Sequence, residues 1–220
     1  MILQTSGTTG EPKNIFQTPE KLKAANEVAR LSQQITPFSS VYTVCKMTHA
    51  GGALAQTLPA QEVGASVDIV EFNAYEFVKN VTKYSHTHIT PRHAKAIMLT
   101  KNFWKLDMSG VWVTCGSDPV EWEVIEAFVS RGATFMTNWG MTEVGPCAIN
   151  TVFDSMEKVK AYKEDSHTSG TLLGDKAWCE YKIVNDELYI KGDICVYDGW
   201  FKTGDWVDII NGKFYYFGRK

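Results

Sequence analysis

GVWVTCGSDPVEWEVIEAFVSRGATFMTN, residues 110–138, contains one complete strand–helix–strand unit. Residues 110–115 and 133–138 are short, apolar and rich in β-branched side chains, which is typical of buried strands. Between them, Asp118-Pro119 has the residue types of a helix start and Gly132 those of a helix end. A unit of this kind favours an α/β domain with a mostly parallel sheet.

The same alternation extends towards the N-terminus. Helical patterns open at Thr18-Pro19 and Thr90-Pro91, where a hydroxyl can cap free N–H groups and Pro costs no hydrogen bond. Further strands are expected at 41–45, 66–70 and 87–89. We therefore expect an α/β nucleotide-binding subdomain over residues 1–150, with helices flanking a mostly parallel sheet.

The pattern changes after about residue 150. Residues 154–169 are polar and rich in Lys and Glu, as in a surface helix or connection. Asn185-Asp186 and Asn211-Gly212 are hairpin signals between short strand-like runs. These runs cover 179–184, 187–191, 206–210 and 213–217. They predict a small antiparallel β-rich subdomain over 151–220, which packs on the first because no Pro/Gly/Ser linker separates the two.

Composition excludes several classes of protein. With 220 residues, 44% hydrophobic and 21% charged, the chain can build a core and is neither disordered nor a coiled coil. A net charge of -3 does not suggest a nucleic acid or an anionic membrane as a partner, and no signal pattern or membrane-length apolar run is present. The five cysteines are odd in number and form no CxxC pair, which favours a reducing cytoplasm over a disulfide framework.

The first motif that carries chemistry is Thr5-Ser6-Gly7-Thr8-Thr9-Gly10-Glu11-Pro12-Lys13. Its glycines, hydroxyls and one ammonium can present N–H, O–H and positive charge to phosphate oxygens. It lacks the Gly-Lys-Ser/Thr ending of a P-loop, and residues 14–18 after it are strand-like, so it is expected at the tip of a strand–loop–strand. The alternative is an ordinary Ser/Thr/Gly surface turn.

Two further motifs follow. Asn138-Trp139-Gly140-Met141-Thr142-Glu143 comes directly after a strand, at the end where open α/β sheets bind ligands. Glu143 offers oxygen to Mg²⁺ and Trp139 a flat surface to a base. Gly199-Trp200-Phe201-Lys202-Thr203-Gly204-Asp205 precedes Gly218-Arg219, and Asp205 can accept hydrogen bonds from a ribose diol. A core Trp, a surface Glu, a turn Asp and a solvated Arg are the alternatives.

These strings, in this order, resemble the adenylate-forming superfamily of acyl-CoA synthetases, peptide-synthetase adenylation domains and luciferases. The three motifs resemble its phosphate loop, its aromatic-Gly-x-Thr-Glu motif and its Gly-Trp-x-x-Thr-Gly-Asp motif, with Gly218-Arg219 at the start of its hinge motif. Weaker matches are Met47-Thr48-His49-Ala50-Gly51-Gly52, Gly116-Ser117-Asp118-Pro119 and Glu187-Leu188.

The resemblance implies activation of a small carboxylic acid by ATP, with release of pyrophosphate and formation of an acyl-adenylate. The implied cofactors are ATP/AMP and Mg²⁺, the latter on Glu143, and the acyl acceptor is CoA or another thiol. The implied catalytic set is Lys13, Thr142, Glu143 and His49, with His49 bordering the acyl pocket. The implied nucleotide-binding residues are Thr5, Ser6, Gly7, Thr8, Thr9, Gly10, Lys13, Gly116, Ser117, Asp118, Asn138, Trp139, Gly140, Met141, Thr142, Asp205 and Arg219.

Departures from the family leave alternatives open. Asp118 replaces an alanine and can meet the adenine amino group, but we expect it to cap the helix at Pro119. His86, His88 and His93 can suggest zinc, although no Cys or acidic ligand lies nearby in sequence. The sequence begins at the phosphate loop and ends past Arg219, so we expect a truncated member of the family, a natural short chain rather than a fragment.

Three functions are compatible with this resemblance and its departures. The first is an AMP-forming carboxylate ligase, performing the whole reaction or only the adenylation half-reaction. The second is a module that binds an adenine nucleotide or an acyl-adenylate without turnover, and the third is a structural role without a ligand. A homodimer or a partner chain is expected to cover the apolar face that the family's N-terminal segment covers.

Overall fold

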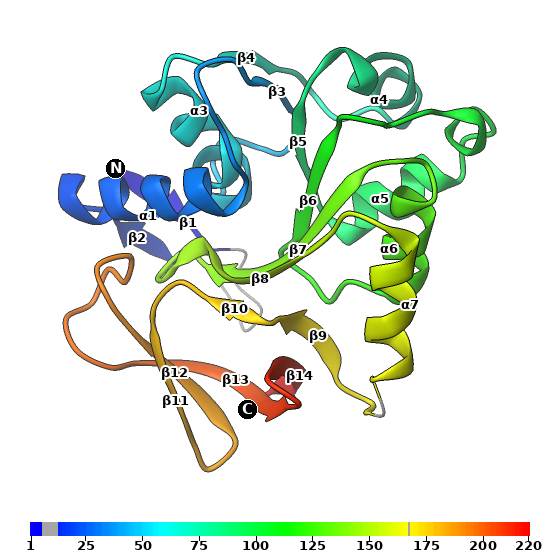
Figure 1. Ribbon diagram of the computed structural model, residues 1–220. Coiled ribbons are helices and arrows are strands. Elements are labelled where there is room, and N and C mark those ends of the chain that lie inside the picture. Colours follow the sequence, from blue (N-terminus) through cyan, green and yellow to red (C-terminus); the bar gives the residue numbers. More distant parts are fainter. Residues whose placement is uncertain (6–12, 167) are drawn as a thin grey trace.

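The computed structural model describes residues 1–5, 13–166 and 168–220, and the strands within these ranges form three sheets (Figure 1). The largest is the predicted α/β sheet, in the order β10-β8-β7-β6-β5-β3-β4. Strands β3 to β7 of this sheet are parallel, whereas β8 runs antiparallel to β7 and β10 antiparallel to β8. Their bounds are β3 Ser40–Thr43, β4 Ser66–Ile69, β5 His86–Ile89, β6 Trp112–Gly116, β7 Thr134–Met141, β8 Gly145–Phe153 and β10 Lys176–Ala177.

Helices cover both faces of this sheet, with α1 and α3 on one side and α4 to α7 on the other (Figure 1). On the second side, Phe77, Ile97 and Phe128 pack with Val113 and Phe135 of the strands into one buried cluster. The helices are α1 Pro19–Ser32, α2 Ala50–Gly52, α3 Leu58–Glu62, α4 Ala74–Asn80, α5 Pro91–Met98, α6 Trp122–Val129 and α7 Met156–Glu164. Short π or 3₁₀ turns are Ala53–Thr57, Val81–Lys83 and Phe103–Lys105.

Two of the three predicted helix starts are confirmed. Thr18 accepts a hydrogen bond from the Lys21 amide at 3.3 Å, and Thr90 accepts one from the His93 amide at 3.2 Å. Each hydroxyl therefore satisfies a free N–H group of the first turn.

The predicted start at Asp118-Pro119 is wrong. Helix α6 begins at Trp122, its N-cap residue is Glu121, and no side chain caps it. Ser117, with φ of 80°, turns the chain after β6, and Val120 is then buried in the core before the helix begins. Burial of Val120 outweighs the local capping preference of Asp118, whose side chain lines a cavity instead.

The second sheet is antiparallel, in the order β11-β12-β13-β14-β9. Asn185 and Asp186 have φ of 51° and 62°, and Asn211 and Gly212 have 52° and 74°, so both predicted hairpins turn through left-handed residues. The strands are β9 Thr171–Gly174, β11 Glu180–Val184, β12 Glu187–Lys191, β13 Phe201–Ile210 and β14 Lys213–Arg219.

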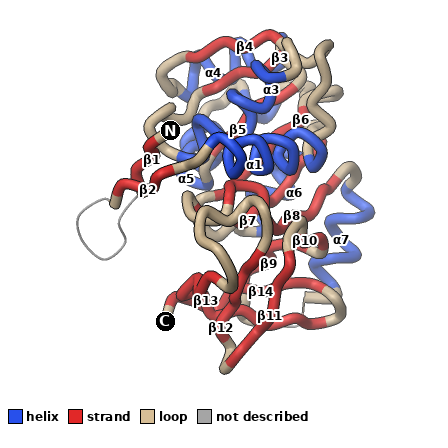
Figure 2. The backbone as a smooth tube through the Cα atoms, turned by 90° about the vertical axis from the view of Figure 1, so that its left-hand side faces the viewer, coloured by secondary structure: helices blue, strands red, loops and turns tan. Residues whose placement is uncertain are grey.

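The two large sheets pack against each other (Figure 2). Leu188, Val207 and Phe214 of the second sheet share one buried cluster with Trp139 and Ile149 of the first. Strand β8 crosses residue 150 and β10 returns to the first sheet, so the two units are joined closely. The subdomain boundary at residue 150 stays a prediction.

The third sheet is the antiparallel pair β1 (Ile2–Gln4) and β2 (Asn14–Phe16). It carries the two ends of the predicted strand–loop–strand, whereas Ser6, Gly7, Thr8, Thr9 and Gly10 lie outside the described residues. Leu3 packs on Ala53 and Leu54, which fixes this ribbon beside the first sheet.

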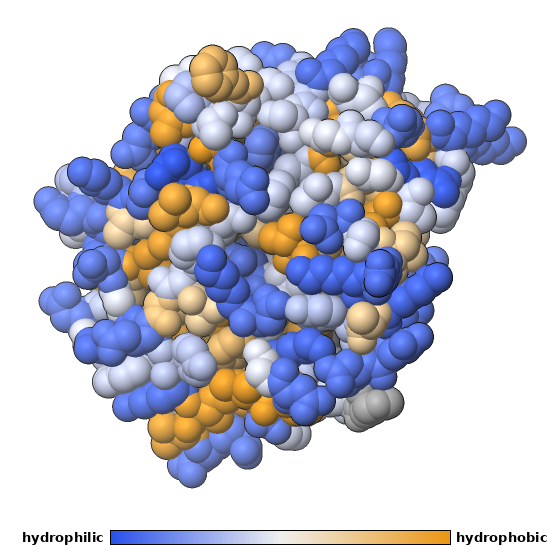
Figure 3. Space-filling model, in the orientation of Figure 1, coloured by the Kyte–Doolittle hydropathy of each residue, from blue (hydrophilic) through white to orange (hydrophobic). Residues whose placement is uncertain are grey.

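On the face that Figure 3 shows, most side chains are hydrophilic, and a group of hydrophobic side chains lies at the lower left, over the second sheet. Val184, Trp206 and Ile209 are among the exposed apolar side chains of that sheet. The homodimer or partner chain stays a prediction. All five cysteines are free thiols. Among the described residues, no helix is both long and apolar enough to cross a membrane.

Candidate nucleotide and acyl site

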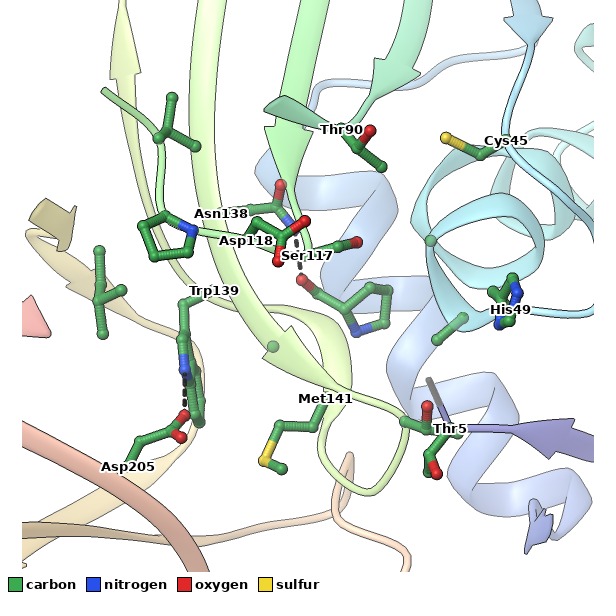
Figure 4. Close-up of a pocket in the computed structure, with 18 of the residues that line it drawn as sticks. Thr5, Cys45, His49, Thr90, Ser117, Asp118, Asn138, Trp139, Met141 and Asp205 are labelled. Carbon is green, nitrogen blue, oxygen red and sulfur yellow. Dashed lines mark hydrogen bonds between the residues drawn. The ribbon is translucent and has the colours of Figure 1, made fainter. Parts of the chain in front are cut away.

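A cavity of about 760 Å³ lies where β5, β6 and β7 end. The carboxyl ends of parallel strands are where open α/β sheets bind ligands. Its walls come from all three sheets, with Asp205 and Trp139 at one end, Cys45 and Thr90 at the other and Thr5 to one side (Figure 4).

At the first end, Trp139 bridges the two large sheets. Its indole Nε1 donates a hydrogen bond to Asp205 Oδ2 at 2.9 Å, and Arg219 Nε lies 3.1 Å from Asp205 Oδ1. Arg219 also donates to the backbone oxygen of Thr203 at 3.1 Å. Burial raises the pKa of Asp205, while the hydrogen bond from Trp139 and the charge of Arg219 oppose that rise. The side chains of Asp205 and Arg219 are therefore held in place by these contacts on the cavity wall.

The adjoining wall has a buried acceptor. Asn138 Nδ2 donates to the backbone oxygen of Pro146 at 2.6 Å, whereas Asn138 Oδ1 is buried with no partner among the described residues. A Cβ at Gly116 would lie 2.5 Å from Asn138 Oδ1 and from its backbone oxygen, so only glycine fits there. Asn138 Oδ1 therefore lies against Gly116, behind the cavity wall.

The turn between β7 and β8 places Thr142 and Glu143 on the cavity wall. Gln17 Nε2 donates to the Thr142 backbone oxygen at 2.6 Å, and the Val196 amide donates to the Glu143 backbone oxygen at 2.9 Å. These bonds fix the backbone of the turn from two sides, so the side chains of Thr142 and Glu143 are presented from an anchored backbone.

The residues present fit a magnesium ion shared with a ligand. Among the described residues, no three His, Cys, Asp or Glu side chains are grouped to hold a metal alone. Mg²⁺ keeps several waters and is usually bound through one or two carboxylates together with phosphate oxygens. The Glu143 carboxylate, on the cavity wall, matches that donor set.

Thr5 and Lys13 close the neck of the first motif. The Thr5 amide donates to the Lys13 backbone oxygen at 2.9 Å, and the Lys13 amide donates to Thr5 Oγ1 at 3.1 Å. Both residues line the cavity. The segment 6–12 between them lies outside the described residues, so its predicted contacts stay predictions.

The other end of the cavity is lined by residues that the motifs do not include. Cys45, His88, Thr90 and His93 join the predicted His49 there. Burial raises the pKa of Cys45 to about 12, so this thiol is not a ready nucleophile. In the sequence, His88 and His93 suggest zinc ligands. The signal that could place them at the cavity is their position around the end of a strand, where the family that the motifs resemble has a strand and a helix at the pocket.

The predicted site residues are thus largely brought together. Thirteen of them line the same cavity: Thr5, Lys13, His49, Ser117, Asp118, Asn138, Trp139, Gly140, Met141, Thr142, Glu143, Asp205 and Arg219. Gly116 lies behind this wall, where it contacts Asn138. Of the three histidines considered for zinc, His86 lies away from it, bonded to the backbone oxygen of Gln33 at 2.9 Å.

Known proteins that are similar to this chain include two CoA ligases. An indoleacetate–CoA ligase of Aromatoleum aromaticum is 26% identical to this chain, and the match spans 93% of this chain and 44% of the ligase. A human mitochondrial malonate–CoA ligase is 23% identical, and the match spans 100% of this chain and 48% of the ligase. The chain therefore spans about half the length of the curated relatives it matches.

A solved structure of O-succinylbenzoate coenzyme A synthetase from Bacillus subtilis, in complex with ATP and magnesium ion, superposes with a TM-score of 0.79. The superposition spans 98% of this chain and 48% of the synthetase chain, and the two sequences are 19% identical. The family model described as "AMP-binding enzyme" matches residues 1–199. The chain belongs to this family of AMP-binding, adenylate-forming enzymes.

Proposed function

We propose that this chain binds ATP in the cavity and activates a carboxylic acid as its acyl-adenylate, releasing pyrophosphate. The observation that carries the proposal is the juxtaposition of Trp139, Asp205 and Arg219 at one end of a cavity whose side wall holds Thr5 and Lys13. The first group suits a nucleoside and the second suits phosphates.

The nucleoside end supplies complementary groups. The Trp139 indole offers a flat face to the adenine ring. Asp205, fixed by Trp139 and Arg219, is placed to accept hydrogen bonds from ribose hydroxyls.

The phosphate end supplies charge and donors. Lys13 carries a positive charge beside the loop neck, and the Thr142 hydroxyl is proposed to contact the α-phosphate. Glu143 would hold Mg²⁺, which when bound neutralises negative charge on the triphosphate. Orientation and charge neutralisation of this kind are the main protein contributions to displacement at phosphorus.

In the proposed reaction, a carboxylate oxygen of the acid attacks the α-phosphorus of ATP. The bond between the α-phosphorus and the bridging oxygen of the β-phosphate breaks, and that oxygen leaves with pyrophosphate. The chain's residues hold the two reactants together and exclude other orientations. CoA or another thiol is the proposed acceptor of the acyl group in a later step.

Exchange of labelled pyrophosphate into ATP tests the proposal, because the adenylation step is reversible. Exchange should require an added carboxylic acid and fall at least about tenfold in Lys13→Ala and in Glu143→Ala. Lys160→Ala and Glu164→Ala remove the same charges from the exposed surface of α7 and should exchange like the parent protein.

Calorimetric titration with ATP and AMP distinguishes the alternatives. Nucleotide binding without exchange over a broad panel of acids would favour a module that binds an adenine nucleotide or acyl-adenylate without turnover. Absence of nucleotide binding would refute both functions.

A further inference from the structure

The carboxylate of Asp118 is a cavity group that the fold does not use. Asp118 is exposed, lines the cavity and makes no hydrogen bond or ion pair with any described residue. Asp205, on the same cavity wall, is instead paired with Trp139 and Arg219. An exposed carboxylate without a protein partner, inside a cavity, is available to a ligand.

The chain around Asp118 explains why it is left without a partner. Ser117, with φ of 80°, turns the chain after β6, and Val120 is 7% exposed within the core. Glu121 is the N-cap residue of α6 and pairs with Lys95 at 2.7 Å. The loop is therefore held by Val120 and Glu121, and the side chain of Asp118 remains on the cavity side.

Asp118 and Trp139 follow two neighbouring strands. Gly116 of β6 is the register partner of Asn138 of β7, so Asp118 comes two residues after this pair and Trp139 one residue after it. Both residues line the cavity, and Figure 4 shows Asp118 between Trp139 and Ser117. A base that lies on the Trp139 ring would thus present one edge to Asp118.

A carboxylate restricts the groups that can bind beside it. When ionised it only accepts hydrogen bonds, so it attracts N–H groups and repels carbonyl oxygens. A hydrogen bond to an ionised acceptor is also about twice as strong as one between neutral groups. Adenine carries an amino group at C6, whereas hypoxanthine and guanine carry a carbonyl oxygen at that position.

We propose that Asp118 selects the base of the nucleotide, because its carboxylate accepts a hydrogen bond from the C6 amino group of adenine and repels a carbonyl oxygen there. This inference rests on the proposed function, since a base meets Asp118 only if the nucleotide binds on Trp139. It makes Asp118 a specificity-determining residue rather than a helix cap.

Three nucleoside monophosphates isolate this contact. AMP, purine riboside 5′-monophosphate, which lacks the amino group, and IMP, which has an oxygen in its place, are titrated calorimetrically into the 220-residue chain. None of them carries a β- or γ-phosphate, so the comparison needs no Mg²⁺. AMP should bind about tenfold more tightly than purine riboside monophosphate, and IMP no more tightly than the latter.

Variants of Asp118 connect the preference with its carboxylate. Asp118→Ala should weaken AMP binding about tenfold and leave the binding of purine riboside monophosphate unchanged, which also shows that the variant is folded. Asp118→Asn has an amide that can donate to an oxygen, so it should bind IMP at least as tightly as AMP. Asp198→Asn removes the same charge from an exposed residue that does not line the cavity, and it should keep the preference of the parent protein.

The other outcomes contradict the inference in different ways. Equal binding of AMP and purine riboside monophosphate by the parent protein overturns this inference alone. A preference for AMP that survives in Asp118→Ala also overturns it, because another group then recognises the amino group. Failure of all three nucleotides to bind the parent protein refutes the proposed function, and this inference with it.

An amino group on the acid is the other donor that Asp118 could bind. Stable acyl-sulfamoyl-adenosine mimics with butanoyl and 4-aminobutanoyl groups test this, because they differ only in that group. The two mimics should bind Asp118→Ala and the parent protein with the same ratio of affinities. A gain from the acyl amino group that Asp118→Ala abolishes would assign the carboxylate to the acid and overturn its assignment to the base.

Discussion

Replacing Trp139 by Phe tests how the nucleotide end is held together. The change removes a 2.9 Å hydrogen bond to the carboxylate of Asp205, which is 6% exposed. A hydrogen bond to a charged group contributes about 1.5–3 kcal/mol to stability. At about 2 kcal/mol, a chain of this size should lose about 4–8 °C in Tm.

Trp178→Phe is the matched control. Its Nε1 donates to the neutral amide oxygen of Asn150 at 3.3 Å, so the same substitution should cost about 1 kcal/mol or less. Both variants lose the same atoms, but only Trp139→Phe removes a hydrogen bond to a carboxylate; Trp178→Phe also changes the ring over which Lys176 Nζ lies, 3.7 Å from the centroid.

The pH dependence separates the charge from the packing. The bond from Trp139 lowers the pKa of Asp205, so it favours the ionised carboxylate over the protonated one. The cost of Trp139→Phe should therefore be largest at pH 7 and shrink as the pH falls through the pKa of Asp205, whereas that of Trp178→Phe should stay constant. Unfolding in urea at pH 7 and pH 4 measures both. Equal costs in the two variants, or a Trp139→Phe cost independent of pH, would refute the reasoning.

Three further predictions concern stability. Burial lowers the pKa of His88 from 6.5 to about 4, so between pH 7 and pH 5 the unfolded chain binds a proton that the folded chain does not. Over this range the free energy of unfolding should therefore fall by about 2 kcal/mol more in the parent protein than in His88→Asn; an equal fall in both proteins, measured by unfolding in urea, would contradict this. Gly116→Ala should cost about 1–3 kcal/mol and weaken AMP binding in calorimetry, because its Cβ would lie 2.5 Å from the Asn138 backbone oxygen; unchanged binding would count against the close fit. Thr18→Ala should lose about 1 kcal/mol in thermal unfolding and Asp118→Ala less than about 0.5; the reverse order would restore Asp118 as a cap.

Local chemistry predicted much of the fold. Thr18 and Thr90 cap their own helices, and Asn185-Asp186 and Asn211-Gly212 turn their own hairpins, so a few neighbouring residues suffice to place each element. Parallel strands were predicted for the same reason, from short apolar runs between capped helices.

Elements defined by distant partners were missed. Strand β8 carries buried Asn150 and Thr151, whose polar atoms pair with Trp178 and Asp175 more than twenty residues away. These residues give no local apolar alternation, so the pattern that marks a strand is absent. The start of α6 was misplaced because Val120 packs in a core assembled by the whole sheet.

The candidate site shows the same division. Motifs located the end of the cavity at Trp139, because neighbouring positions in the chain place Trp139 at the end of β7 and Thr142 and Glu143 on the turn that follows it. The surroundings of His88 were not predictable, since Gly51, from another segment of the chain, packs beside its ring. The substrate end of the cavity is therefore the part that required the structure.

The contact of Trp139 with Asp205 joins strand β7 of one sheet to β13 of the other. A nucleotide held by both residues would bind only while the two sheets remain together, so its free energy would add to the cooperativity between them. Amide hydrogen exchange would register this coupling: the second sheet would open independently in the free protein and only together with the first once the ligand is bound.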